Sequence, residues 1–261
     1  MFRAIATDLD GTLLDADSRI NARSWQALRR AAAAGCQLIV ATGRHHRDVR
    51  DILAAGSDLA IRVISANGAR VHDHDDRQLL AANLAPALVN KLVQPALAGD
   101  AEIALYLDEH RVACRYQGPL QAYAGKAQQL DSLQDYHGSH VAKIIYYAPP
   151  VRLAAIETEI LHRFEGQLAL VYSQDCYLEV MAPGVSKGSA LALLLQQLDI
   201  APQDCAAFGD AQNDVEMLQL VGHPHRMANA SPRLYGQVPQ AREIGHHAES
   251  AVAGVLEQAF A

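Results

Sequence analysis

The sequence predicts an α/β fold with a Rossmann-like, doubly wound parallel-sheet core and an inserted α+β cap domain. Apolar strands alternate with helices at both ends of the chain, and this alternation is interrupted in the middle. Polar motifs follow several of the core strands, where open parallel sheets bind ligands. A chain of 261 residues, half of them apolar, is long enough to bury a substantial core.

The first part of the core is expected in residues 1–82. Asn21 is placed to cap a helix that ends near Gly35, and the next run, residues 37–41, has no polar alternation, which is typical of a strand buried on both faces. Strand, helix and strand in this order indicate a parallel sheet. The expected elements are strands at 3–8, 37–41 and 61–66, helices at 21–35 and 47–53, and a hairpin at 70–72 and 78–82.

An α+β insertion is expected at residues 83–183, a plausible length for a domain. Its expected elements are helices at 86–97, 120–129 and 151–164 and strands at 102–106, 111–115, 141–147, 168–173 and 177–181. The turn at Pro183 and Gly184 then leads to Ser186, which caps a helix at 187–198, and a strand follows at 205–209. Residues 184–261 therefore complete the core.

The charge of the chain excludes several classes of partner. The formal net charge is −7, and lysines and arginines are scattered rather than clustered, so we expect no nucleic acid and no membrane surface. The N-terminal apolar stretch is too short for a signal peptide, and no segment is long enough to span a bilayer, so a cytoplasmic protein is expected. No CxxC spacing indicates zinc, and most of the paired histidines are interpreted as surface residues. The oligomeric state stays open.

Four polar pieces lie where core strands end or where a core helix begins. Each has a structural reading when taken alone, because acidic residues after strands commonly cap turns and a lysine in the first turn of a helix is usually solvated. Together and in this order they indicate a functional site. They are Asp8-Leu9-Asp10-Gly11-Thr12, Thr42-Gly43-Arg44, Lys187, and Gly209-Asp210-Ala211-Gln212-Asn213-Asp214.

This arrangement resembles the haloacid dehalogenase superfamily of phosphohydrolases, and the resemblance covers the whole core. It implies that Asp8 is the nucleophile, Asp10 the general acid and base, and Lys187 the neutralising cation. It also implies Mg²⁺ at a site made by Asp8, Asp10, Asp210 and Asp214, with Asp10 contributing its backbone carbonyl and Asp214 orienting metal-bound waters. Thr42, Gly43 and Asn213 would bind the phosphoryl oxygens. Near the core edge and the linkers, candidates for contact with the leaving group are Arg44, His45, Tyr177 and Glu179, for which solvent exposure and hinge packing are the alternatives.

The chemistry of these residue types agrees with those roles. Carboxylates at positions i and i+2 of an extended segment project to one side and can flank one substrate group. One carboxylate attacks phosphorus while its neighbour transfers protons, and an all-oxygen ligand set suits Mg²⁺. The expected enzyme is a phosphatase that passes through an aspartyl phosphate.

The cap and several further stretches, among them ATGRHHRDVRDILA and DCYLEVMAPGVSKGSAL, are similar to the Cof-type branch of the superfamily. The branch implies a small phosphorylated metabolite as substrate, with hydroxymethylpyrimidine pyrophosphate first and sugar phosphates or pyridoxal phosphate as alternatives. A protein that binds such a metabolite without catalysis is the alternative from another class. The sequence departs from the pattern at Ala228, where the family usually has Gly.

Overall fold

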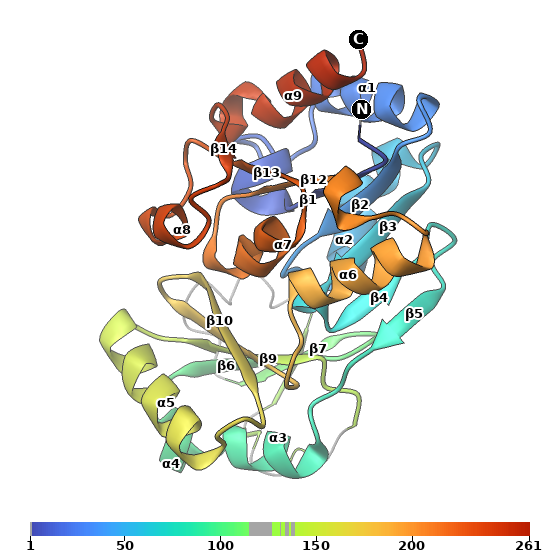
Figure 1. Ribbon diagram of the computed structural model, residues 1–261. Helices are drawn as coiled ribbons and strands as arrows, with labels where there is room; N and C mark the ends of the chain where they lie inside the picture. The colour runs from blue at the N-terminus through green and yellow to red at the C-terminus, as the bar shows by residue number, and fades with distance from the viewer. Residues whose placement is uncertain (1, 115–126, 131, 134–135, 137–138) are drawn as a thin grey trace. The chain divides into compact units, whose positions relative to one another are not determined.

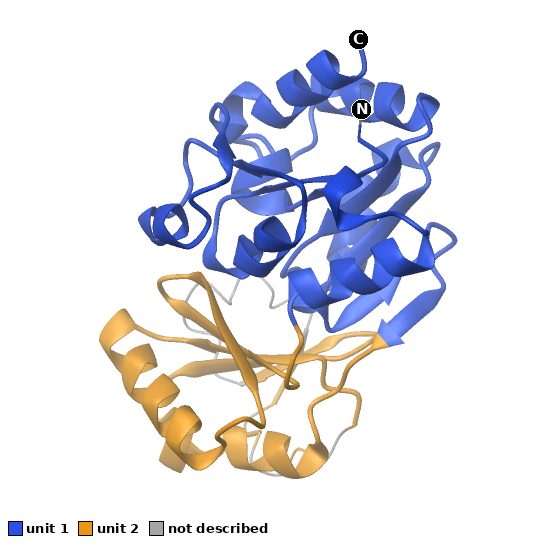
Figure 2. Cartoon of the chain, viewed as in Figure 1, with its two compact units in different colours: residues 1–80, 186–261 blue, residues 81–185 orange. Residues whose placement is uncertain are grey.

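The structure is a computed structural model that describes residues 2–114, 127–130, 132–133, 136 and 139–261. The chain divides into two compact units, drawn in different colours in Figure 2. One comprises Met1–Leu80 with Ser186–Ala261, and the other comprises Ala81–Val185. Two distant stretches of sequence thus build the first unit, and the second is inserted between them.

The first unit is built around a sheet with the strand order β14-β13-β12-β1-β2-β3-β4-β5. From β14 to β3 neighbouring strands run parallel, whereas β3 and β4 are antiparallel. The strands are β1 (Ala4–Thr7), β2 (Gln37–Ala41), β3 (Ile61–Ser65), β4 (Arg70–His72), β5 (Gln78–Ala81), β12 (Cys205–Gly209), β13 (His223–Arg226) and β14 (Arg242–Glu243).

Helices cover both faces of this sheet (Figure 1). Because side chains alternate along a strand, Ile5 joins a buried cluster with Trp25 of α1, whereas its neighbour Ala6 joins a second cluster with Leu191 of α6. The first cluster also contains side chains of α2 and α9, and the second contains side chains of α7 and α8. These helices are α1 (Ala22–Ala33), α2 (His46–Leu53), α6 (Lys187–Gln197), α7 (Val215–Leu220), α8 (Pro232–Gln237) and α9 (Ala251–Ala259).

The second unit has its own sheet, with the strand order β10-β11-β9-β6-β7-β8. Its strands are β6 (Glu102–Tyr106), β7 (Arg111–Cys114), β8 (Ala127–Gln129), β9 (Lys143–Tyr147), β10 (Ala169–Gln174) and β11 (Tyr177–Met181). The helices are α3 (Pro86–Leu92), α4 (Pro95–Ala98) and α5 (Pro150–Arg163), which pack on one sheet face through residues such as Val89, Leu97 and Ile156. The predicted parallel core with an α+β insertion is therefore confirmed as a fold class.

Two local predictions are wrong. The helix expected at 86–97 is broken at Pro95, because proline lacks an N–H and its ring clashes with the carbonyl four residues earlier. Most of the helix expected at 120–129 lies outside the described residues, and its last three residues form β8 instead. Most of the paired histidines are not buried, as predicted, although His45, His72 and His225 are; His225 lies on β13 against Phe208.

No helix in the described part of the chain combines the length and the apolar character needed to cross a bilayer.

Candidate active site

The site lies at the carboxyl ends of the central core strands. β1 pairs in parallel with β12 on one side and with β2 on the other, so Thr7 lies opposite Phe208 and opposite Val40. The three strands therefore end at the same edge of the sheet, and the motifs that follow them meet there. Asp8 follows β1, Thr42 follows β2 and Asp210 follows β12.

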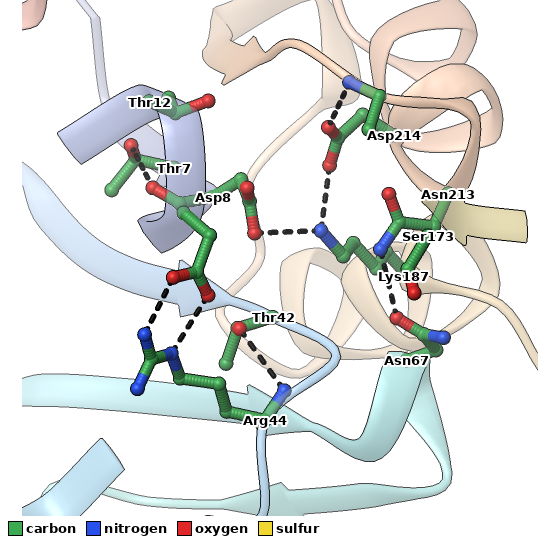
Figure 3. Close-up of polar contacts among 12 residues, drawn as sticks. Thr7, Asp8, Thr12, Thr42, Arg44, Asn67, Ser173, Lys187, Asn213 and Asp214 are labelled. Carbon is green, nitrogen blue, oxygen red and sulfur yellow. Dashed lines mark hydrogen bonds and ion pairs between the residues drawn. The ribbon is translucent and has the colours of Figure 1, made fainter. Parts of the chain in front are cut away.

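Lys187 connects two of the predicted acidic residues. Its Nζ donates to Asp8 Oδ1 and to Asp214 Oδ1, each at 2.7 Å, and the lysine is fully buried. Figure 3 shows the ammonium between the two carboxylates. Lys187 is the first residue of α6, a helix end that Ser186 fixes through a capping box with Ser189. The helix cap thus positions the ammonium that Asp8 and Asp214 share.

The electrostatics of this pair of contacts favour a charged lysine. Burial opposes the charge of Lys187, but Asp214 and Asp8 outweigh it, so its pKa is raised above the ordinary value. For Asp8 the dominant effect is burial, which raises its pKa well above the ordinary value even though Lys187 acts in the opposite direction. The nearby carboxylates of Asp214 and Asp210 raise it further.

Asp214 holds the loop after β12 in place. Its Oδ2 accepts the backbone N–H groups of Asp210 and Ala211, both at 3.0 Å, while its Oδ1 binds Lys187. These three donors hold the fully buried side chain in one orientation. Asp214 therefore orients the segment that carries Asp210.

Asp8, Asp210 and Asp214 form a group that fits a divalent cation. Each offers a carboxylate oxygen, and the three oxygens lie within 4.8 Å of one another. With three carboxylates and one buried ammonium, the group has a formal excess of two negative charges, which a Mg²⁺ ion would balance. Burial and the neighbouring Asp214 raise the pKa of Asp210 to about 7, as expected for acidic groups that repel one another. Thr12 Oγ1 donates to Asp210 Oδ1 at 3.1 Å and steadies this carboxylate.

Gly11 allows Asp210 to approach the turn after β1. The residue has a φ of 72°, in the left-handed region, and a Cβ placed on it would lie 2.4 Å from Asp210 Oδ2. A side chain here would displace the carboxylate, and its backbone conformation would also be strained. Glycine at this position therefore serves the position of the Asp210 carboxylate as well as the turn.

We expect Gly11→Ala to weaken binding of a divalent cation, and Gly35→Ala to leave that binding unchanged. Both glycines have positive φ, 72° and 83°, but nothing lies within 4 Å of a Cβ placed on Gly35. Each variant should lose about 1–2 kcal/mol of the free energy of unfolding from backbone strain alone. Titration calorimetry with Mg²⁺ checks the difference, and equal affinities in the two variants would show that Gly11 does not protect the position of Asp210.

The side chain of Asp10 engages Arg44 and does not join the three converging carboxylates. The Arg44 Nε and Nη2 atoms donate to Asp10 Oδ2 and Oδ1 at 2.7 and 2.5 Å, which is a two-pronged ion pair. The sequence places both residues in the site, but it does not predict that they bind each other. A contact between Asp10 and a metal would have to come from its backbone carbonyl.

The predicted phosphoryl-binding residues lie in the segments that follow β2 and β12. Thr42 Oγ1 accepts the Arg44 backbone N–H at 3.1 Å, and a hydroxyl that accepts one bond retains its own proton for donation. Asn213 Nδ2 donates to Asn67 Oδ1 at 3.1 Å, as Figure 3 shows. Asn67 has a φ of 55° and is buried in the turn after β3. The sequence Asn67-Gly68 predicts this turn, but it does not predict the side-chain contact between Asn67 and Asn213.

Ala228 adopts an ordinary backbone conformation. It is absent from the described residues with positive φ, and it is exposed, so a Cβ is accommodated without strain. The next residue reaches the site: Asn229 Nδ2 donates to the Gly11 carbonyl at 2.8 Å. The departure from the family pattern therefore leaves the loop able to brace the turn after β1.

The chain matches known proteins over nearly its whole length. Residues 5–256 match the family described as haloacid dehalogenase-like hydrolase. The chain is 33% identical over 262 residues to the HMP-PP phosphatase of Serratia proteamaculans (strain 568), an alignment that covers 98% of this chain and 95% of that protein. It is 35% identical over 261 residues to the HMP-PP phosphatase of Yersinia enterocolitica, with the same coverage, 98% and 95%.

Solved structures show the same fold. A haloacid dehalogenase-like hydrolase from B. subtilis has a TM-score of 0.87 at 25% identity, with 98% of this chain and 99% of that chain covered. A second one, from Bacteroides thetaiotaomicron, has a TM-score of 0.85 at 22% identity and covers 99% of this chain. The expectation of a phosphatase is confirmed, and the chain belongs to the haloacid dehalogenase-like hydrolase family.

Proposed function

We propose that the protein is a Mg²⁺-dependent phosphatase that transfers the phosphoryl group of a small metabolite to Asp8 and then to water. The observation that carries this proposal is the cluster at the sheet edge, where Asp8 contacts the buried ammonium of Lys187 and converges with Asp210 and Asp214. A carboxylate nucleophile needs nearby positive charge to approach a phosphate. The ammonium of Lys187 supplies one positive charge, and the carboxylates of the cluster are ligands for a cation that would supply more.

Asp8 and Asp210 would hold Mg²⁺ through their carboxylates, and the Asp10 carbonyl would complete the protein ligands. When bound, Mg²⁺ neutralises charge on the phosphoryl group and on the attacking carboxylate. Lys187 keeps the Asp8 carboxylate oriented and adds positive charge beside the transferring group. Asp214, held by backbone N–H groups, keeps Lys187 and Asp210 in place.

The reaction proceeds in two displacements at phosphorus. An Asp8 oxygen forms a bond to phosphorus, the bond to the leaving oxygen breaks, and Asp10 gives that oxygen a proton. Asp10 then takes a proton from water as the water oxygen attacks the aspartyl phosphate, which restores the Asp8 carboxylate and releases inorganic phosphate. Proton transfer of this kind contributes roughly 10²- to 10⁴-fold in rate. Thr42, the Gly43 N–H and Asn213 would donate to the phosphoryl oxygens.

Hydroxymethylpyrimidine pyrophosphate is the first substrate to test, because the relatives from Serratia proteamaculans and Yersinia enterocolitica are named HMP-PP phosphatases. A broad phosphatase of sugar phosphates or pyridoxal phosphate is the second candidate. Phosphate release should be measured for all of these compounds with Mg²⁺ and again with EDTA. We expect turnover that EDTA abolishes, whereas no release from any compound would favour a non-catalytic binding protein.

The dependence of Mg²⁺ affinity on pH follows from the raised pKa of Asp210, about 7. Below this pH the carboxyl is protonated and is a poor ligand, so cation binding displaces a proton and tightens as the pH rises. Because Asp210 ionises more readily in the unfolded chain, the same raised pKa lowers the free energy of unfolding of the cation-free protein as the pH rises from about 4 to about 7.

Mg²⁺ should therefore raise the melting temperature more at about pH 8 than at about pH 6. Differential scanning fluorimetry with saturating Mg²⁺ measures this increment at each pH, and Asp210→Asn should give a much smaller increment that varies little with pH. Equal increments at both pH values in the wild-type protein would mean that Asp210 does not titrate in this range.

A further inference from the structure

The turn after β3 contains three consecutive residues in the left-handed backbone region. Ala66, Asn67 and Gly68 have φ values of 49°, 55° and 102°. Glycine adopts this region freely and asparagine tolerates it, but the Cβ of an alanine comes too close to the following carbonyl oxygen. Backbone strain of this kind persists only where surrounding contacts impose it, and it is concentrated at functional sites. The contacts of this turn therefore indicate its role.

The backbone of the turn is bound to the segment after β2. The Asn67 N–H donates to the Thr42 carbonyl at 3.0 Å, and the Ala66 N–H donates to the Arg44 carbonyl at 2.9 Å. Thr42 is one of the residues that we propose to bind the phosphoryl oxygens, and its own N–H donates to the Ile64 carbonyl of β3 at 2.8 Å. The turn thus fixes the backbone that presents the Thr42 hydroxyl.

The side chain of Asn67 reaches the second phosphoryl-binding segment. Its Oδ1 accepts a hydrogen bond from Asn213 Nδ2 at 3.1 Å, although the two residues are 146 positions apart (Figure 3). Asn67 is 1% exposed, so the bond is anchored on a side chain that is removed from bulk water. One residue therefore contacts Thr42 through its backbone and Asn213 through its side chain.

The bond to Asn67 decides which end of the Asn213 amide faces the turn. A primary amide carries two donors on its nitrogen and only acceptor sites on its oxygen. Because Asn67 presents an oxygen, the Asn213 nitrogen turns toward it, whereas a flipped amide would set two oxygens against each other. Asn213 Oδ1 is buried without a hydrogen-bond partner among the residues that the structure describes, which opposes this orientation. The contact with Asn67 outweighs that cost and leaves the second N–H for a phosphoryl oxygen.

Gly68 brings the same turn against the start of α6. A Cβ placed on Gly68 would lie 2.1 Å from the carbonyl oxygen of Ser186, the residue that caps the helix of Lys187. Such a close approach requires a residue without a side chain. The turn after β3 therefore adjoins three segments, which carry Thr42, Asn213 and Lys187.

We infer that Asn67 is a positioning residue for phosphoryl binding, which holds the Thr42 and Asn213 donors at a fixed spacing and keeps an N–H of the Asn213 amide directed at the phosphoryl group. The inference rests on the proposed function and adds a residue to the same site. Without the Asn67 side chain the Asn213 amide is able to rotate, and an oxygen then faces the anionic phosphoryl group for part of the time. Asn67 thus acts through Asn213.

The test is a double-mutant cycle of Asn67→Gly and Asn213→Ala, measured as kcat/KM for p-nitrophenyl phosphate with Mg²⁺. Glycine suits the left-handed backbone and keeps the N–H that binds Thr42, so Asn67→Gly removes only the side chain. We expect Asn67→Gly to lower kcat/KM about 3- to 10-fold, the value of an ordinary hydrogen bond, and Asn213→Ala to lower it about 10- to 100-fold, the value of a hydrogen bond to a charged group.

The interaction between the two substitutions separates positioning from a general structural effect. In the Asn213→Ala protein, Asn67→Gly should lower kcat/KM by less than about twofold, because the residue through which Asn67 acts is already absent. The matched control is Ser18→Gly, an exposed residue with a φ of 56° in the segment after β1, which should leave kcat/KM unchanged. An unchanged kcat/KM in Asn67→Gly, or an equal loss with and without Asn213, would overturn the role of Asn67.

Binding of inorganic phosphate, measured by calorimetry with saturating Mg²⁺, gives a readout that does not require turnover. Asn67→Gly should weaken phosphate about 3- to 10-fold and leave the Mg²⁺ affinity of the phosphate-free protein unchanged, because Lys187, Thr12 and backbone N–H groups hold the three carboxylates. Equal losses of phosphate and Mg²⁺ affinity would overturn the role of Asn67 and leave the phosphatase intact. Lack of phosphate release by the wild-type protein would instead overturn the proposed function, and phosphate binding by the same variants would still decide the role of Asn67.

Discussion

Asp8→Asn is expected to lower kcat by on the order of 10⁴-fold or more, because an amide oxygen neither attacks phosphorus nor forms the aspartyl ester that water resolves. The fold should survive the change. Asn keeps the size of the side chain, and it removes one of three carboxylates that crowd within 4.8 Å of one another. The measurement is steady-state phosphate release together with the melting temperature of the cation-free protein.

Asp17→Asn is the matched control for this variant. Asp17 lies in the exposed segment after the same strand and loses the same charge, but its side chain is exposed and its backbone N–H donates to Asp15 Oδ1, outside the acidic cluster. It should keep normal activity. Near-normal turnover by Asp8→Asn in the same assay would refute the assignment of the nucleophile, whatever the substrate.

Lys187→Met is expected to cost about 3–5 kcal/mol of the free energy of unfolding, as well as activity. The substitution nearly preserves the volume of the side chain but leaves the buried carboxylates of Asp8 and Asp214 without their shared ammonium. A loss of this size is a large part of the total stability of an ordinary domain. Chemical denaturation at neutral pH measures it, with the exposed Lys91→Met as a control that should change stability little.

A double variant separates this electrostatic effect from a simple packing defect. Adding Asp8→Asn to Lys187→Met removes one of the two stranded carboxylates, so the double variant should be more stable than Lys187→Met alone. If the double variant is no more stable than Lys187→Met, the loss of stability arises from packing around α6. In that case Lys187 would not be the counter-charge of the cluster.

Much of the core follows from local signals in the sequence. Residues 37–41 lack polar alternation, as a strand with helices on both faces must, and the structure buries Leu38 and Ile39 in opposite helix-covered clusters. Ser186 caps the helix that begins at Lys187, as predicted. Strand polarity then brings the motifs to one edge of the sheet, since parallel strands place their carboxyl ends together.

Contacts between distant segments are the part that the sequence does not reveal. Thr12 and Asp210 are 198 positions apart, and the hydrogen bond between them depends on the register of β1 against β12. The bond between Asn67 and Asn213 likewise needs two turns to arrive at the same place. A residue type and a spacing identify what a side chain is able to do, but they do not identify which partner it meets.

The pairing of Arg44 with Asp10 is the clearest example. Each residue belongs to a recognisable motif, and an expectation based on motifs gives the arginine to substrate and the carboxylate to proton transfer. The structure adds that the two side chains bind each other through two hydrogen bonds. This ion pair cannot be read from the linear sequence, because it depends on the directions in which the two side chains leave the segments after β1 and β2.

The stereochemical course of hydrolysis at phosphorus tests whether Asp8 carries the phosphoryl group. Each in-line displacement inverts the configuration of the transferred group, so attack by Asp8 followed by attack by water predicts net retention. The measurement uses a substrate whose terminal phosphoryl group is made chiral with oxygen isotopes and sulfur, hydrolysed with Mg²⁺ in isotopically labelled water. Retention is the expected result, and inversion would mean that water attacks the substrate directly and that no aspartyl phosphate forms.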